Sequence, residues 1–393
     1  MKIGIVTNLY PPLVRGGAEW LTYLVAREFV KQGHQVIVIT LAAPGAAGGD
    51  HGVGKTEEGV KVYRFNTGYI YHYLNAANHA RPVRLFWHIQ HLFNWPLRNQ
   101  IVRVLMAARC DLIISSNLMG LSFNLPKTLK TLAKTYVHIA HDVQLLHPSG
   151  LFMVGETRGG RLESLYQSIT RWLFNSPTVV VFPSQWLEQE YVQRDFFPNS
   201  RKIVLRNPSL DFVSADTAAS TNKFNLLYVG QAEEHKGIFW LLETLKNIND
   251  TAWKLDLALT GQTGDRQRIN RLVASDSRIK VWDNLPQEEI NKKYQQAGVV
   301  VVPSLCHENA PVSILLALAA GTPVLASNAG GIAELVGDNQ TGYLFKPGDQ
   351  TEFTNKLKLL TPATVAEFHA NIKNTYQPVP LAEYGQKLIS FGQ

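Results

Sequence analysis

The sequence predicts an α/β protein with two doubly wound, Rossmann-like domains that face a central cleft. Three observations carry this prediction. Short β-branched runs alternate with amphipathic stretches along nearly the whole chain. The length of 393 residues suffices for two domains. Hydrophobic residues make up 45% and charged residues 18% of the chain, a composition that excludes a disordered protein.

The first series of elements begins at the N-terminus. A helix is expected at residues 19–32, where apolar residues recur at helical spacing and Gly33 follows as a typical helix end. The expected strands cover residues 2–7, 35–40, 61–65, 112–115, 134–139 and 178–182. Strands that alternate with helices in this way predict a parallel sheet with helices on both faces.

A second series follows a polar stretch, and a hinge is expected near residues 206–223. The expected strands of this series cover residues 225–230, 254–260, 279–282, 299–303, 322–326 and 343–345. The predicted division is an N-terminal domain at residues 1–206, a C-terminal domain at 207–375, and a final helix at 376–393 that packs back toward the N-terminal domain. Ligands of such sheets bind beyond the carboxyl ends of the strands.

The charge is unevenly distributed. Up to Arg206 the chain holds 22 Lys and Arg against 12 Asp and Glu, which gives +10, whereas the remainder holds 16 against 19, which gives −3. A basic first half predicts an anionic partner, either a membrane surface, a phosphorylated lipid or a nucleic acid. The basic residues form no recognition module, so nucleic acid is not expected.

The two cysteines, Cys110 and Cys306, are too few for a disulfide framework, and no Cys/His spacing indicates a metal site. No apolar stretch approaches the roughly 20 residues that span a bilayer. These features predict a cytoplasmic protein. Residues 81–109 interleave aromatic and aliphatic residues with Arg and His. This stretch is either an interface helix that holds the protein peripherally at the inner face of the plasma membrane, or a helix pair packed on the sheet with extended arginines.

Residues 49–56 match the phosphate-loop pattern of nucleoside triphosphatases letter for letter. That loop works only between a strand and a helix whose N-terminus faces the phosphates. Here a Gly/Ala-rich loop precedes the pattern and an alternating strand follows it at residues 60–65. The pattern therefore predicts a surface loop and no triphosphatase site.

In each domain, the loop that follows the first strand carries a candidate anion-binding motif. In the first, Pro-Pro and Arg15 precede Gly16 and Gly17 at the start of a helix, where paired glycines let the backbone approach an anion. A plain turn with a helix cap is the alternative. In the second, Lys236 and Gly237 offer a point charge for a diphosphate, with a solvated loop as the alternative.

Residues 303–324 pass from a strand through a polar loop and an apolar helix to another strand. Glu308 lies just before that helix, where a carboxylate either binds sugar hydroxyls or caps the helix. In the first domain, His138, His141 and Asp142 stand at a strand exit. Such a group is compatible with a structural or a catalytic role.

Taken together, these motifs resemble the retaining glycosyltransferases of family 4, which have the glycosyltransferase-B fold. The resemblance also rests on Gly33-His34-Gln35-Val36 and on Gly330-Gly331 with Glu334-Leu335-Val336, and it spans residues 2–348. It implies a nucleotide-sugar donor of the UDP or GDP type held mainly by the second domain, a glycan or lipid-linked acceptor held mainly by the first, and no obligatory metal or other cofactor.

The resemblance also implies roles for individual residues. His141 would lie near the reacting carbon, Glu308 would bind hydroxyls of the transferred sugar, and Lys236 would bind the diphosphate. The remaining donor contacts would come from Arg15, Gly16, Gly17, Gly230, Gln231, Asn309, Ala310, Pro311, Val312 and Leu316.

Two positions depart from the family pattern. The second glutamate of the family, which holds the ribose, is replaced by Leu316, and the arginine after the loop glycine is replaced by Gln231. Each exchange removes a charged partner worth roughly 1.5–3 kcal/mol. The resemblance as a whole implies retaining transfer of a hexose-type sugar to a surface-glycan or lipid-linked acceptor in polysaccharide biosynthesis. The alternative is a non-catalytic protein of the same fold that binds a glycan or a partner enzyme. An epimerase would need further carboxylates that the sequence does not place.

Overall fold

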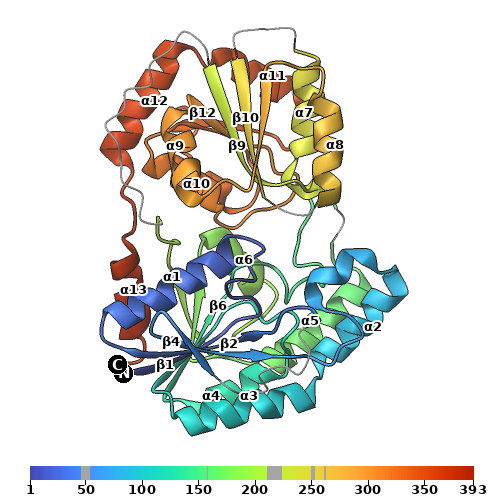
Figure 1. The fold of residues 1–393 in the computed structure, drawn as a ribbon, viewed down its shortest axis with the longest axis vertical. Coiled ribbons are helices and arrows are strands. Elements are labelled where there is room, and N and C mark those ends of the chain that lie inside the picture. The colour runs from blue at the N-terminus through green and yellow to red at the C-terminus, as the bar shows by residue number, and fades with distance from the viewer. Residues whose placement is uncertain (46–53, 157, 210–223, 249–252, 261–262) are drawn as a thin grey trace. The chain divides into compact units, whose positions relative to one another are not determined.

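The chain forms two compact units in a computed structural model that describes residues 1–45, 54–156, 158–209, 224–248, 253–260 and 263–393 (Figure 1). Unit 1 comprises Met1–Leu151, Thr157–Arg206 and Leu381–Gln393, and unit 2 comprises Phe152–Glu156 and Asn207–Pro380. Each unit is built around one sheet with helices packed on it (Figure 1).

Unit 1 contains an eight-stranded sheet in the order β3-β4-β2-β1-β5-β6-β7-β8. Its strands are β1 (Lys2–Val6), β2 (Gln35–Leu41), β3 (Lys55–Glu57), β4 (Val60–Phe65), β5 (Leu112–Ser115), β6 (Thr135–Ile139), β7 (Val179–Phe182) and β8 (Arg201–Val204). All pairs are parallel except the hairpin of β3 with β4. The order reverses between β1 and β5, which creates the crevice where doubly wound sheets bind ligands.

The helices of unit 1 cover this sheet. They are α1 (Gly17–Lys31), the 3-10 helix η1 (Tyr73–Asn78), α2 (Arg81–Leu92), α3 (Trp95–Ala108), α4 (Leu125–Leu132), α5 (Arg161–Phe174), α6 (Gln185–Val192) and α13 (Leu381–Ser390). The C-terminal helix α13 packs along α1, where the Gln32 side chain donates to the Ala382 carbonyl at 3.2 Å. The last residues of the chain therefore complete the core of the unit in which the chain begins.

Unit 2 contains a fully parallel six-stranded sheet in the order β11-β10-β9-β12-β13-β14. Its strands are β9 (Phe224–Gln231), β10 (Trp253–Thr260), β11 (Ile279–Asp283), β12 (Val299–Val302), β13 (Val324–Ser327) and β14 (Gly342–Phe345). Its helices are the 3-10 helices η2 (Glu234–Lys236) and η3 (Gly331–Glu334), and α7 (Ile238–Lys246), α8 (Thr263–Val273), α9 (Gln287–Gln296), α10 (Val312–Ala319), α11 (Gln350–Leu359) and α12 (Pro362–Thr375). The order again reverses once, between β9 and β12.

All twelve expected strands are confirmed to within two residues at each end. The short edge strands β3 and β8 were not expected. The phosphate-loop pattern begins in residues that lie outside the described ones, but its end forms β3, which turns directly into β4. The absence of a helix after the pattern is thus confirmed. The expected hinge lies mostly in residues 210–223, outside the described ones. Among the described helices, none is long and apolar enough to cross a membrane.

Candidate functional site

The site in unit 2 lies where the strand order reverses. The loop after β9 carries Lys236, and the loop after β12 carries Glu308. Because β9 and β12 are parallel neighbours, both loops leave the same edge of the sheet. The backbone N–H of Leu305 donates to the His235 carbonyl at 2.9 Å, which ties the two loops together.

Gly237 sets how closely these loops approach. Its φ of +73° lies in the left-handed region, and a Cβ atom there would stand 1.8 Å from the carbonyl oxygen of Pro303. Only glycine meets both conditions without displacing the backbone. The fold therefore requires a glycine directly after Lys236, and this glycine fixes the position of the backbone from which the Lys236 side chain extends.

The side chains of Lys236 and Glu308 form an ion pair with 2.7 Å between Nζ and Oε1. The Ser304 hydroxyl donates to the same oxygen at 2.9 Å. Burial alone would raise the pKa of the Glu308 carboxyl, but the Lys236 ammonium and these hydrogen bonds hold it below its ordinary value. Burial likewise opposes the charge of Lys236, yet Glu308 holds the pKa of the lysine above its ordinary value. Both groups are therefore charged at neutral pH.

The backbone of Glu308 is held by Gly330 and Gly331. The Gly331 N–H donates to the Glu308 carbonyl at 2.7 Å. Gly330 has a φ of +67°, and a Cβ atom there would stand 2.3 Å from the same carbonyl oxygen. In the sequence analysis these two glycines contributed only to the resemblance. In the structure they let the chain after β13 pass in direct contact with the Glu308 backbone.

The segment Phe152–Glu156 also supports this loop, and sequence reasoning missed it. Although it lies within the first half of the chain, it belongs to unit 2 and pairs antiparallel with the residues just before Glu308. The Val154 N–H donates to the Leu305 carbonyl at 3.0 Å, and the His307 N–H donates to the Phe152 carbonyl at 2.8 Å. No turn or strand signal in the sequence marks so short a segment, because its pairing depends on tertiary structure.

The other predicted donor residues of unit 2 fall into two groups. Five of them are partly exposed: Gly230 and Gln231 at the end of β9, Asn309 and Ala310 in the loop after β12, and Val312 at the start of α10. Pro311, just before α10, is buried. Leu316 is only 5% exposed and lies among other buried residues of α10. The apolar α10 thus packs into the core around Leu316.

In unit 1 the loop after β1 carries Arg15, Gly16 and Gly17. Gly16 is the N-cap of α1, and its N–H donates to the Glu19 carboxylate at 2.8 Å. Arg15 is exposed. Burial raises the pKa of the nearby Tyr73 hydroxyl, and the positive charge of Arg15 partly opposes this rise. The predicted glycines therefore do start a helix, but the first of their N–H groups already has a carboxylate partner.

His141 and Asp142 follow β6 on the same edge of this sheet. Burial lowers the pKa of the His141 imidazole to about 4, so it is neutral at pH 7. Burial also raises the pKa of the Asp142 carboxyl to about 7; the Gln144 N–H opposes this and the Glu19 charge adds to it. The Asn117 side chain donates to the Asp142 carboxylate at 3.3 Å and therefore lies at the same crevice. The sequence alone did not single out this residue.

His138, by contrast, is structural. Its Nδ1 lies 2.8 Å from the Ser115 hydroxyl, which in turn lies 2.7 Å from the Tyr136 hydroxyl, and all three side chains are buried in the sheet. Within the described ranges there is no group of three His, Cys, Asp or Glu residues that could hold a metal ion. Both cysteines are buried free thiols.

Two family models match this chain. The model "Glycosyltransferase Family 4" matches residues 15–208, and the model "Glycosyl transferases group 1" matches residues 223–361. The chain therefore belongs to the family 4 glycosyltransferases and has the glycosyltransferase-B fold, as the sequence predicted.

The chain is also similar to individual proteins. The chain is similar to an uncharacterized 42.6 kDa protein in the cps region of Klebsiella pneumoniae, with 24% identity over 340 residues that cover 85% of this chain and 87% of the relative. It is also 28% identical over 183 residues to a lipopolysaccharide 1,2-N-acetylglucosaminetransferase of Salmonella typhimurium, which covers 42% of this chain and 48% of that protein. The solved structure of Anabaena Alr3699/HepE in complex with UDP superposes with a TM-score of 0.69 at 17% identity, covering 99% of both chains.

Proposed function

We propose that this protein is a retaining glycosyltransferase that moves a hexose-type sugar from a nucleotide-sugar donor to a surface-glycan or lipid-linked acceptor. The observation that carries the proposal is the charged pair of Lys236 and Glu308 at the point where the sheet order of unit 2 reverses. Doubly wound sheets bind nucleotides at this point. The pair supplies a cation for phosphate oxygens and a carboxylate for hydroxyl groups.

In the proposed reaction, Lys236 and the N-terminus of α10 stabilise the leaving diphosphate, and Glu308 accepts hydrogen bonds from the sugar. The bond between the anomeric carbon and the diphosphate oxygen breaks, and the acceptor oxygen bonds to that carbon on the same face. The acceptor proton passes to the leaving diphosphate. Catalysis thus consists of positioning and electrostatic stabilisation.

The protonation of nearby groups supports a mechanism without a side-chain nucleophile. Burial, with the Glu308 charge, raises the pKa of the Cys306 thiol to about 12, so the thiol beside Glu308 is protonated and unreactive at neutral pH. His141 is neutral, which suits a hydrogen-bond partner for a sugar hydroxyl near the reacting carbon and not an additional positive charge.

The proposed identities of the donor and the acceptor are supported by the relatives. The bound UDP in the HepE structure supports a nucleotide-sugar donor of the UDP type, with GDP as the competing nucleotide. The Salmonella relative acts on lipopolysaccharide, which supports an acceptor in surface polysaccharide biosynthesis. We place the protein in the cytoplasm and, because its first 206 residues carry a charge of +10, peripherally at an anionic membrane surface.

A second function, glycan or partner binding without catalysis, is favoured by one observation. Leu316 and Gln231 stand where the family has charged partners of the nucleotide, and Leu316 is buried in α10. A chain that has lost these contacts could keep the fold and the acceptor site while losing the donor.

Calorimetric titration of the purified chain with UDP, GDP and ADP separates the two functions. The proposed transferase binds one nucleotide in preference to the others, and Glu308→Gln abolishes sugar transfer while the chain stays folded. No heat with any nucleotide would favour the non-catalytic function. An unchanged turnover of Glu308→Gln would remove Glu308 from the mechanism.

A further inference from the structure

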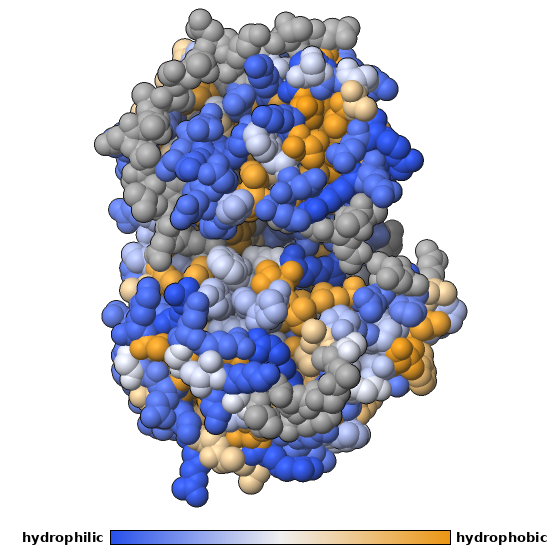
Figure 2. All heavy atoms as spheres, viewed as in Figure 1, coloured by the Kyte–Doolittle hydropathy of each residue, from blue (hydrophilic) through white to orange (hydrophobic). Residues whose placement is uncertain are grey.

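Two helices of unit 1 carry large apolar side chains on their solvent faces. On α2 these are Leu85, Phe86 and Ile89, here called the α2 face. On α5 they are Leu162, Leu165 and Trp172, the α5 face. The six side chains are between 52% and 84% exposed. Figure 2 shows apolar residues gathered on the outside of unit 1 where α2 lies in Figure 1.

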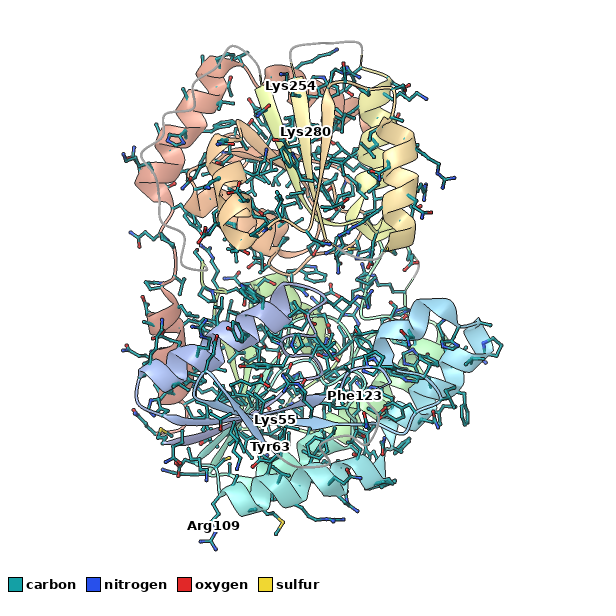
Figure 3. The ribbon with its side chains drawn as sticks, in the orientation of Figure 1. Lys55, Tyr63, Arg109, Phe123, Lys254 and Lys280 are labelled. Atoms are coloured by element: carbon teal, nitrogen blue, oxygen red, sulfur yellow. The ribbon has the colours of Figure 1, made fainter. Side chains whose placement is uncertain are left out.

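These faces are additional to the ones that hold the helices in place. α2 buries Trp87 and His91, and α5 buries Phe174 at its end. The rings of His91 and Phe174 both contact Phe123, with centroid distances of 4.1 and 5.2 Å, and Phe123 lies inside unit 1 (Figure 3). Each helix is thus apolar on two sides, whereas a surface helix of a globular protein normally has one apolar side.

Basic residues outnumber acidic ones on both helices: α5 carries Arg161 and Arg171 against Glu163, and the excess is larger around α2. From Asn66 to His141 the chain contains eight Lys and Arg residues and a single acidic residue, Asp111.

Two of these cations lie directly on exposed aromatic rings. The guanidinium of Arg98 lies 4.5 Å from the ring centre of Trp95, and Lys127 Nζ lies 3.4 Å from that of Trp172. Cations next to exposed tryptophans are the arrangement that suits the headgroup region of a bilayer, where the ring is half buried and the charge meets phosphate.

We propose that the α2 and α5 faces dock onto an anionic lipid bilayer, with the apolar side chains in the interface and the surrounding Lys and Arg on the lipid phosphates. The positive charge selects this occupant over a second copy of the chain, because two copies meeting through these faces would bring like charges together. The inference refines the proposed membrane association by naming its surface, and it does not depend on sugar transfer, because no residue of unit 2 takes part.

Flotation of the full chain with phosphatidylcholine vesicles, with and without phosphatidylglycerol, tests the inference. The chain should float with the anionic vesicles and only weakly with the neutral ones. The triple variant Leu85→Ser, Phe86→Ser, Ile89→Ser should partition at least about tenfold less, because three exposed apolar side chains lose their burial in the interface. The double variant Leu162→Ser, Leu165→Ser should show a smaller loss of the same kind.

Matched controls keep the result interpretable. Leu272 and Leu359 are also exposed, but they lie in unit 2, so Leu272→Ser, Leu359→Ser should float as the parent does. All these residues are exposed, and the melting temperature should not change. In Arg84→Gln, Arg98→Gln the preference for anionic vesicles should fall while weak binding to neutral vesicles persists.

Three results would overturn the inference. The first is a parent chain that does not float. The second is an α2-face variant that floats as well as the parent. The third is a parent that is dimeric in ultracentrifugation and becomes monomeric in the α2-face variant without vesicle binding, which would assign the faces to a second copy. UDP titration of the same variant reads the donor site separately, so loss of flotation with unchanged UDP binding concerns the membrane surface alone.

Discussion

Lys236 Nζ and Glu308 Oε1 lie 2.7 Å apart, although 72 residues of the chain separate them. The two side chains are 27% and 14% exposed, so the pair is shielded from water but remains accessible to a ligand. Each group keeps the other charged, and a diphosphate with its sugar offers each a new partner: phosphate oxygens for the ammonium and hydroxyls for the carboxylate. The ion pair thus already holds both side chains in the charged forms that the proposed donor contacts require.

Lys236→Ala should weaken nucleoside diphosphate binding by roughly 1.5–3 kcal/mol, the usual contribution of a charge-assisted contact. The loss should be smaller at high salt, because the lysine is partly exposed. Lys293→Ala is the matched control, since Lys293 forms a similarly shielded ion pair with Asp256 at 2.9 Å elsewhere in unit 2. Equal losses of affinity in both variants, measured by calorimetry, would show a general effect of charge and not a contact in the site.

Gly330→Ala should lower both stability and donor affinity. A left-handed glycine replaced by alanine costs about 1 kcal/mol from backbone strain alone. At Gly330 the new Cβ would also meet the Glu308 carbonyl at 2.3 Å and push the loop that carries the carboxylate. Gly33→Ala separates the two effects, because Gly33 has a φ of +82° with no atom within 4 Å of the new Cβ. Chemical denaturation should show the larger loss for Gly330→Ala, and only this variant should bind nucleotide less well.

Much of this framework could be predicted from the sequence. The strands are β-branched and buried, so local composition reveals them, and the order of the loops places Lys236 and Glu308 after the strands where the sheet order reverses. The contact between the two side chains could not be predicted, since it depends on Gly237 and Gly330 bringing separate loops together at close range. The pairing of Phe152–Glu156 with the loop that carries Glu308 could not be predicted either, because a segment of five residues is too short to show a periodic pattern.

The pH dependence of stability should show the unusual carboxyl of Asp142. Its pKa is raised by burial from an ordinary value of 3.8 to about 7 in the folded chain. The unfolded state therefore loses the proton first, and between about pH 4 and pH 7 stability should fall as the pH rises, by at most about 1.4 kcal/mol per pH unit. Asp142→Asn should remove this slope in urea titrations across that range. An identical slope in the variant would assign the effect to another group.

Leu316→Glu tests whether the family's missing carboxylate can be restored. The resemblance to family 4 implies a ribose contact at position 316, and on that basis alone the new carboxylate should tighten nucleotide binding by something like 1–2 kcal/mol. The structure leads us to expect the opposite result, because Leu316 is 5% exposed and its neighbours Ile314, Leu315, Ala317 and Leu318 are buried as well. An unpaired carboxylate in these surroundings should lower the free energy of unfolding by several kcal/mol without any gain in affinity. Leu359→Glu, at an exposed position of α11, should leave both quantities unchanged. Thermal melts with and without UDP read both effects at once. If UDP raises the melting temperature of Leu316→Glu more than that of the parent, α10 borders the nucleotide and the lost glutamate can be restored.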